Sequence, residues 1–484
     1  MFNQILRIIL LVNTILSLYV VFHRKRSVAT TWAWLIILLI LPVIGFILYG
    51  FLGRGLSQEN LFAINQQNHI GLKKVRKMLP QHVRKTTSPN DTSDTARVLI
   101  DYFNSKGDTP LSKNNEIAIF TDGKAKFRQL FADIAHAQET VNIEYYSFIN
   151  DEIGNEFLDL LVKKAKAGVK VRLIYDPWGS PGASKAWFQP LLDQGGEVIP
   201  FITSRNMITK YRMNYHLHRK EVIIDGRISW TGGFNVGDQY LGKSKKFGYW
   251  RDTHVRILGS ASLLLQERFV MDWNASVQKE EDEVIFEPRL FPKMHKNSQP
   301  NNSVATQIVS DGPDQDEPYM RNGMIRLMMM ARQTLWIQTP YLVPDDPMIA
   351  TWRIAARSGV DVRIMIPCMP DHPFIYRATQ WYAKQLMREG IKIYIYQNGF
   401  IHAKTVVVDD KYSTIGSMNQ DYRSYTLNFE AIAAFYDQKI AREMKQIFLH
   451  DTLDCIRLTP AMVDNWSRWL TFKQSFSRLL SPIL

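Results

Sequence analysis

The stretch His402-Ala403-Lys404, followed by Thr405 to Val408 and then Asp409, sets the organisation of this chain. It reads His-x-Lys-x-x-x-x-Asp, and Gly416-Ser417-Met418-Asn419 follows it shortly. A second copy lies upstream, as His218-Arg219-Lys220, then Asp225, then Gly232-Gly233-Phe234-Asn235. His and Asp lie seven residues apart in both copies, and His and Asn lie seventeen apart. The matched spacings indicate one functional unit present twice.

Residues 402 to 408 are rich in valine and favour a strand, in which alternate side chains share a face. His402 and Lys404 therefore point the same way, and so do His218 and Lys220. A lysine binds phosphate oxygens, while a histidine attacks phosphorus or passes a proton to a leaving oxygen. Two facing copies let one histidine act as nucleophile and the other as acid and then base. A single His-x-Lys in a strand usually carries no function, so the duplication decides the interpretation.

The paired stretches resemble the motifs of the phospholipase D superfamily, and with the features below they are most similar to its bacterial cardiolipin synthases. One departure is Gly233, where the family pattern often has the serine found at Ser417. The two half-sites are therefore not expected to be equivalent. The resemblance implies transfer of a phosphatidyl group between two phosphatidylglycerols, which yields cardiolipin and glycerol through a phosphatidyl-histidine.

The expected site contains the two motif sets and two amides. The catalytic residues are His218, Lys220, Asp225, His402, Lys404 and Asp409, and the phosphate-binding amides are Asn235 and Asn419. The amides are placed to donate to developing charge, as in an oxyanion hole. Asp225 and Asp409 follow strand ends, so they are also candidates for buttressing the site. We take His218 as the nucleophile and His402 as the acid and base.

Each motif is followed by a further acid, Asp252 after the first and Glu430 after the second. Either carboxylate is suited to accept a hydrogen bond from the far nitrogen of a catalytic histidine and so fix its tautomer. The superfamily pattern places an orienting acid here. The alternative is an ordinary surface carboxylate.

Composition narrows the class of protein. The chain has 484 residues, enough for two or three domains, and a formal charge of +13. Its two cysteines exclude a disulfide framework, and no Cys/His cluster has zinc spacing, so we expect no metal and no cofactor. The positive charge fits an anionic membrane or nucleic acid as partner.

The N-terminus favours the membrane. Phe2 to Phe22 and Thr31 to Leu52 are mostly apolar runs near the about 20 residues that span a bilayer, separated by His23-Arg24-Lys25-Arg26. A cleaved signal peptide fits poorly, because basic rather than small residues follow the first run. Residues 1–53 therefore predict a transmembrane helical hairpin of a multi-pass cell-membrane protein. Flanking charges leave the orientation ambiguous, and we favour cytoplasmic catalytic halves.

Beyond a polar and basic linker at 54–113, helix and strand patterns alternate twice. Strands are expected at Thr140–Tyr146 and Val169–Tyr175, and again at Thr334–Thr339 and Val360–Ile366. Helix 156–167 ends at Gly168, and a second helix ends before Gly359. The order predicts an α/β fold with mostly parallel sheets and two similar halves, 114–290 and 300–460. A pseudo-twofold between the halves would bring the two His-x-Lys strands together.

Residues 461–484 have the aromatic spacing of an amphipathic helix, with Trp466, Trp469 and Phe476 on one side. Docking of this helix on the core is favoured over a position in the membrane interface. The expected partners are phosphatidylglycerol and anionic membrane lipids. No nucleic acid is expected, and the oligomeric state stays open.

Three other functions remain compatible with the sequence. A lipid hydrolase would use the same intermediate with water as acceptor. A nuclease of the superfamily would share the motifs and the basic surface, although the N-terminal hairpin argues against it. A non-enzymatic membrane scaffold is disfavoured because histidine, lysine, aspartate and asparagine are present in both copies.

Overall fold

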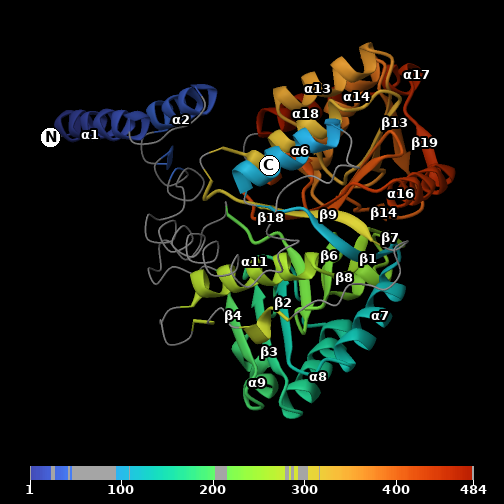
Figure 1. The fold of residues 1–484 in the computed structure, drawn as a ribbon. Coiled ribbons are helices and arrows are strands. Elements are labelled where there is room, and N and C mark those ends of the chain that lie inside the picture. The colour runs from blue at the N-terminus through green and yellow to red at the C-terminus, as the bar shows by residue number, and fades with distance from the viewer. Residues whose placement is uncertain are drawn as a thin grey trace.

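One mixed sheet of fifteen strands runs through both halves of the molecule, with helices on both of its faces (Figure 1). The structure is a computed structural model that describes residues 2–22, 28–41, 44–45, 49, 94–107, 109–201, 215–277, 283–284, 288–292, 303–315 and 317–481. Everything below concerns those residues.

The first half follows the order strand, helix, strand that its sequence predicts. Its strands are β1 (Ser112–Phe120), β2 (Thr140–Tyr145), β3 (Lys170–Tyr175), β4 (Glu197–Pro200), β5 (Lys220–Ile224), β6 (Ile228–Gly232), β7 (Trp250–Arg251) and β8 (His254–Gly259). Its helices are α7 (Gly123–Ala135), α8 (Glu152–Lys166), α9 (Lys185–Leu192) and α11 (Ala261–Ser276). Side chains of Asp122, Asp151 and Ser184 cap the first three of these helices.

The second half repeats the pattern. Its strands are β9 (Val304–Asp311), β10 (Thr334–Gln338), β11 (Leu342–Val343), β12 (Asp361–Pro367), β13 (Lys392–Tyr396), β14 (Phe400–Ile401), β15 (Thr405–Val408), β16 (Tyr412–Gly416), β17 (Gln420–Asp421), β18 (Glu430–Phe435) and β19 (Cys455–Arg457). Its helices are α12 (Tyr319–Met328), α13 (Asp346–Arg357), α14 (Pro373–Arg388), α15 (Tyr422–Thr426), α16 (Gln438–Asp451), α17 (Pro460–Asp464) and α18 (Arg468–Leu479).

The strand order shows how the halves are related. It runs β19-β13-β12-β10-β15-β16-β18-β9-β1-β8-β6-β5-β2-β3-β4. Leaving out β19, each strand of one half stands at the place of its counterpart in the other, with β9 and β1 paired at the middle. The chain thus forms two similar α/β halves with the pseudo-twofold arrangement that the duplicated motifs predict.

The expectation of mostly parallel sheets is wrong. Only β2–β3–β4 and β10–β12–β13 are parallel, and the other neighbours in this sheet are antiparallel. The reason lies in the motif strands, because β5 turns at Asp225-Gly226 into β6, and β15 turns at Asp409-Asp410 into β16. Such tight hairpins require antiparallel neighbours.

Three apolar cores hold the layers together. One packs α7, α8 and α9 on the sheet of the first half, and another packs α12, α13 and α14 on that of the second. The third lies on the opposite face, where α11 of the first half and α16 of the second share buried contacts. Ile257 and Phe269 of the first half belong to this shared core with Val407 and Phe435 of the second. The two halves are therefore one packed body.

The segment before β1 differs from the predicted linker. Helix α6 (Asp94–Gly107) packs against α12 and β9, and its Leu99 and Phe103 are fully buried in the core of the second half. Its apolar side chains are spaced at helical intervals within a polar stretch. Residues 54–93 of the predicted linker lie outside the described residues.

The N-terminal segment forms α1 (Phe2–Phe22) and α2 (Val28–Ile40), which pack together. Asn13 Nδ2 of α1 donates to the carbonyl oxygen of Leu38 at 2.8 Å. Among the described residues, no helix combines the length and the apolar character that crossing a bilayer requires. The basic residues 23–27 between the helices lie outside the described residues.

The C-terminal region contains two helices rather than one. Helix α18 packs along α14, which is the docked arrangement that the sequence favoured. Gln474 and Ser477 are buried at this contact, whereas Trp469, Phe472, Phe476 and Leu479 are 50–73% exposed. The helix is therefore docked on one side and apolar on the other.

Candidate active site

The two motif histidines lie where the halves meet, at the carboxyl ends of parallel strands. His218 and Lys220 stand at the start of β5, whose Lys220 is paired with Tyr145 at the end of β2. His402 and Lys404 lie between β14 and β15. All four residues are buried, with 0–8% of their surface exposed. This edge of an α/β sheet is the usual place for a site.

Short parallel pairings between the halves set this position. The residue before His402 pairs with Arg251, and His402 N donates to the Arg251 carbonyl oxygen at 2.7 Å. On the other side Leu217 pairs with Phe429, and His218 N donates to the Phe429 carbonyl oxygen at 2.9 Å. Each histidine segment is thus paired through its backbone with the segment of the other half that carries an acid.

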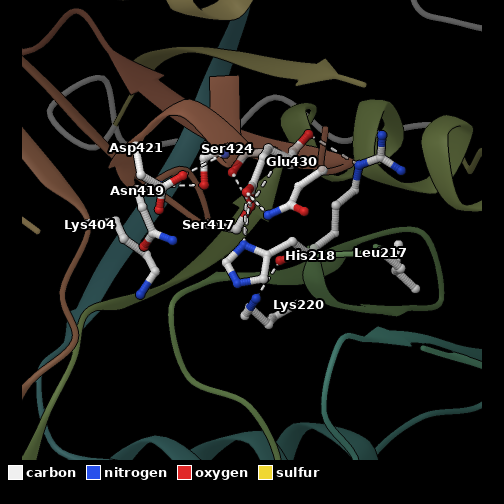
Figure 2. A network of polar contacts seen from close by, with 12 residues as sticks. Leu217, His218, Lys220, Lys404, Ser417, Asn419, Asp421, Ser424 and Glu430 are labelled. Carbon is white, nitrogen blue, oxygen red and sulfur yellow. Dashed lines mark hydrogen bonds and ion pairs between the residues drawn. The ribbon is translucent and has the colours of Figure 1, made fainter. Parts of the chain in front are cut away.

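The result is a crossed pair of histidine–carboxylate contacts. His402 Nδ1 lies 2.6 Å from Asp252 Oδ2. His218 Nδ1 lies 2.8 Å from Glu430 Oε2, a contact that Figure 2 shows. An ionised carboxylate only accepts hydrogen bonds, so Nδ1 carries the proton in both rings. The nitrogen left for chemistry is Nε2 in each case. The sequence identified both acids, but not that each serves the histidine of the other half.

The two acids are held differently. Ser417 Oγ donates a short hydrogen bond to Glu430 Oε2, and Asn428 Nδ2 donates to Oε1 at 3.2 Å. At the equivalent place in the first half, a Cβ on Gly233 would stand 1.9 Å from Asp252 Oδ1. The shorter aspartate therefore occupies the space that a serine side chain would need. This explains why the first half has Gly233 where the family pattern often has a serine.

Burial lowers the pKa values of the two histidines, whereas the crossed acids raise them. Burial lowers the pKa of His218 to about 4 against the opposing charge of Glu430, so the ring is neutral near neutrality. Burial and Lys404 likewise lower the pKa of His402. Burial by itself would raise the pKa of both acids. At Asp252 the nearby His402 and Lys404 outweigh burial and lower the carboxyl pKa. At Glu430 the nearby His218 and Lys220 do the same. Both acids are ionised.

The lysines supply positive charge between the two pairs. Burial lowers the pKa of Lys220 to about 7 and that of Lys404 to about 8, although nearby carboxylates oppose the shift. Lys404 Nζ donates to the carbonyl oxygen of His402 at 2.5 Å and lies 2.9 Å from Nδ1 of the same ring. Lys220 Nζ donates in the same way to the carbonyl oxygen of His218. A phosphate anion placed between these ammonium groups would favour their charged forms.

The two predicted amides lie at this site with unequal surroundings. Asn235 Oδ1 accepts from the amide of Ser147 at 3.2 Å, and its Nδ2 donates to Tyr240 Oη at 2.9 Å. Asn419 is buried beside Lys404, and its Oδ1 has no hydrogen-bond partner among the described residues (Figure 2). One N–H of Asn235 is therefore committed to the protein.

Asp225 and Asp409 stand at the far ends of the motif strands and not at the histidines. Asp225 accepts from the backbone amides of residues 138, 139 and 140 at 2.8–2.9 Å. Asp409 accepts from those of residues 332, 333 and 334 at 2.6–2.8 Å. Their inclusion among residues that do chemistry needs correction, because their carboxylates bind the turns that lead into β2 and β10. The buttressing role is the one that fits.

Sequence reasoning missed two tyrosines. The Tyr146 ring lies 5.2 Å from the His218 ring, and the Tyr341 ring lies 6.5 Å from the His402 ring. Each follows the first parallel strand of its half, β2 or β10. An aromatic residue just past the same strand of each repeat was the signal that would have found them.

The chain matches two family profiles and several cardiolipin synthases along most of its length. A family profile described as cardiolipin synthase, PLD-like domain, matches residues 130–250 and 324–452, and one described as phospholipase D-nuclease N-terminal matches residues 8–54. A cardiolipin synthase of Listeria welshimeri is 42% identical over 99% of both chains. One of Staphylococcus aureus is 40% identical over 98% of this chain and 95% of its own.

A solved structure shares the fold. The crystal structure of phosphatidylserine synthase from Haemophilus influenzae superposes with a TM-score of 0.61. The likeness covers 81% of this chain and all of that one, at 15% identity. At this identity the comparison concerns the fold alone. Each of the two profile matches falls within one half and contains one His-x-Lys motif.

Proposed function

The chain belongs to the cardiolipin synthase family of phospholipase D-like proteins, and we propose that it converts two phosphatidylglycerols into cardiolipin and glycerol. The observation that carries this proposal is the crossed site, in which two histidines and two lysines meet at one place. Each histidine is held by an acid from the other half. That arrangement suits a two-step transfer with one covalent intermediate.

In the first step His218 Nε2 attacks the phosphorus of the first lipid. A P–N bond forms and the P–O bond to the headgroup glycerol breaks. His402, which enters this step protonated on both ring nitrogens beside the phosphate anion, gives its Nε2 proton to the departing oxygen. Glu430 and Asp252 stabilise the positive charge that each ring carries in turn, because each accepts from Nδ1. Lys220 and Lys404 neutralise the phosphate oxygens throughout.

In the second step a glycerol hydroxyl of the second phosphatidylglycerol attacks the phosphatidyl-histidine. A new P–O bond forms, the P–N bond breaks, and the hydroxyl proton passes to His402 Nε2. The products are cardiolipin and a free site. The lower pKa of buried His218 supports its assignment as the nucleophile, since an attacking ring must be unprotonated. We assign N–H groups of Asn235 and Asn419 as further donors to the phosphate oxygens.

A phospholipid substrate requires contact with a membrane, and two regions support that contact. Residues 1–53 match the N-terminal family profile over 8–54, and α1 and α2 expose apolar side chains such as Ile8, Leu11 and Trp32. We assign this pair as a membrane-inserted hairpin with the catalytic halves on the cytoplasmic side. The exposed face of α18 adds a second contact, where Trp469 and Phe472 stack and Lys473 lies 5.5 Å from the Trp469 ring.

The direct test supplies phosphatidylglycerol as sole lipid to purified enzyme in micelles, with a chelator present. Mass spectrometry should find cardiolipin and glycerol in equal amounts. Phosphatidic acid and glycerol without cardiolipin would show that water is the acceptor and would refute the transferase assignment. Loss of all activity in chelator would contradict a mechanism that relies on lysines for charge.

A further inference from the structure

A phenol–carboxylate pair borders the His402 side of the site. Tyr341 Oη donates a short hydrogen bond to Asp371 Oδ2, and the Tyr341 ring stands edge-on to the His402 ring at 6.5 Å. Asp371 follows β12, and its other oxygen accepts from the amide of His372 at 2.7 Å. Asp371 is among the carboxylates that oppose the lowering of the Lys404 pKa by burial, so its charge lies on the Lys404 side of the site.

In the first half an acid, Asp176, directly follows β3, and donors from its own loop and from residues 216–217 fill its acceptor positions. Asp176 Oδ1 accepts from the amides of Trp178 and Gly179 at 2.8 and 3.2 Å. Its Oδ2 accepts from the amide of Leu217 at 3.0 Å and lies 3.4 Å from His216 Nδ1. Asp176 is 3% exposed. This carboxylate fixes the segment that carries His218 and has no capacity left for a ligand.

Asp371 differs from Asp176 both in its burial and in the number of donors that it binds. It is only partly buried, and its described contacts are one phenol and one neighbouring amide. A carboxylate has about four acceptor positions, so Asp371 keeps room for further donors. Tyr341 Oη uses its proton on Asp371 and keeps its lone pairs for another donor. Two adjacent acceptors of this kind match two hydroxyl groups on neighbouring carbons.

We propose that Tyr341 and Asp371 form the subsite for the glycerol headgroup, and that the leaving glycerol and the attacking glycerol occupy it in turn. This inference rests on the proposed function and names where its alcohol binds. In both steps the reacting alcohol is a glycerol hydroxyl whose proton is handled by His402, so one subsite beside that ring serves both. The hydroxyl that does not react donates to Asp371 or to Tyr341.

The subsite has a consequence for acceptor choice. An alcohol with one hydroxyl leaves the acceptors of the pair without a donor once the site closes over it. Sites built to bind a hydroxyl reject analogues that lack it far more strongly than apolar pockets reject an extra group. The pair should therefore favour glycerol over a simple alcohol of similar size.

The test compares acceptors within one reaction. Enzyme is given phosphatidylglycerol together with isotope-labelled glycerol and propan-1-ol, and mass spectrometry follows cardiolipin, labelled phosphatidylglycerol, phosphatidylpropanol and phosphatidic acid. All four products come from one phosphatidyl-enzyme, so their ratios report the acceptor step and are independent of how much enzyme is folded. Asp371→Asn should lower the ratio of glycerol-derived product to phosphatidylpropanol about tenfold or more. Tyr341→Phe should lower it in the same direction.

The matched control is Tyr146→Phe, which removes the same hydroxyl beside His218 and should leave the ratio unchanged whatever its rate. An unchanged ratio in both Asp371→Asn and Tyr341→Phe overturns the subsite. If both variants lose every product, the reaction is repeated with a phosphatidyl ester of nitrophenol, whose departure needs no glycerol subsite. Loss of every product from that ester as well would overturn the subsite. A second reaction of the wild type replaces propan-1-ol with ethanolamine. If ethanolamine outcompetes glycerol there, the subsite binds an ammonium group and the glycerol subsite is overturned. A wild type that forms neither cardiolipin nor labelled phosphatidylglycerol refutes the proposed function instead.

Discussion

At the scale of single residues, the two half-sites solve one problem with different pairs of side chains. The second half uses the longer Glu430 and has room for Ser417, which donates to it. The first half uses the shorter Asp252, which lies directly over Gly233. In both cases the acid reaches a histidine of the other half. The glycine is thus required by the position of Asp252 and is not a weakened copy of the serine.

This compensation predicts that Gly233→Ala is far more harmful than Ser417→Ala. The added Cβ would displace Asp252 from His402, and misplacement by about 1 Å costs on the order of 10²-fold in rate. Ser417→Ala removes one hydrogen bond to a charged group and should cost about tenfold. Turnover of phosphatidylglycerol by both purified variants checks the order. Gly233→Ala with wild-type turnover would contradict the packing of Asp252.

The lysines predict an unusually early loss of activity at alkaline pH. Burial lowers the pKa of Lys220 to about 7 and that of Lys404 to about 8, and both must be protonated to bind phosphate. Activity is therefore present below these values and lost as pH rises through them. The value of kcat/KM, which reports the free enzyme, should fall between about pH 7 and 9. A plateau that continues to about pH 10 would contradict the assignment.

At the scale of elements, the spacing of the motifs predicted the paired histidines and lysines, because a strand fixes which side chains share a face. The sequence also indicated both acids, but their pairing with the histidine of the other half was not predictable in the same way. Asp252 and Glu430 reach their histidines only through the β7–β14 and Leu217–Phe429 pairings between distant segments. Those pairings are too short to leave a strand pattern in the sequence. The tyrosines beside the histidines are local features, each just past β2 or β10, and a comparison of the two repeats at that point would have found them.

The motif aspartates should behave as structural residues. Asp225 has a backbone φ of 52° and accepts from three amides, so Asp225→Ala loses these bonds and strains the turn. We expect destabilisation of about 2–4 kcal/mol, with kcat retained well below the unfolding temperature. Thermal unfolding and kcat together check this. Asp159→Ala, at an exposed position of α8, is the control and should change neither. Unchanged stability with lost kcat would restore a chemical role.

The exposed face of α18 predicts a contribution to lipid access. Trp469 and Phe472 are 64% and 57% exposed, while the opposite side of the helix packs on α14. Replacing both by serine should raise the KM for phosphatidylglycerol in anionic vesicles several-fold and leave kcat in detergent micelles unchanged. Ile354→Ser, at an exposed apolar position on α13, is the matched control. Equal KM values for the two variants would exclude a membrane contact by this helix.

At the scale of the whole molecule, the sequence predicted two similar α/β halves but not how they join. Duplicated motifs and repeated helix and strand patterns were enough for the first conclusion. The continuous mixed sheet depends on β1 pairing with β9 and on the shared core around α11, which are contacts between halves. Alternating patterns describe neighbours along the chain, and they carry no information on such long-range pairing.

Buried ion pairs make the halves inseparable around the site. Arg251, next to Asp252, pairs with Asp451 of α16 at 2.7 Å. Arg219, between His218 and Lys220, donates to the Glu430 carbonyl oxygen at 3.2 Å and pairs with Asp272 and Glu144. Charges buried in this way are costly unless paired. Separation of the halves would break the Arg251–Asp451 pair and the Arg219–Glu430 hydrogen bond, whereas the pairs of Arg219 with Asp272 and Glu144 lie within the first half. The chemistry therefore belongs to the joined molecule and to neither half.

The measurement that tests the account most directly traps the intermediate. His402→Ala enzyme is mixed with a phosphatidyl ester of a good leaving group such as nitrophenol, which needs no acid, and is quenched under alkaline conditions. Without His402 as base the second step stalls, so peptide mass spectrometry should find a phosphatidyl group on His218. The same experiment with His218→Ala should find none. A phosphatidyl group on His402 in that second variant, or none on His218 in the first, would contradict the assigned roles.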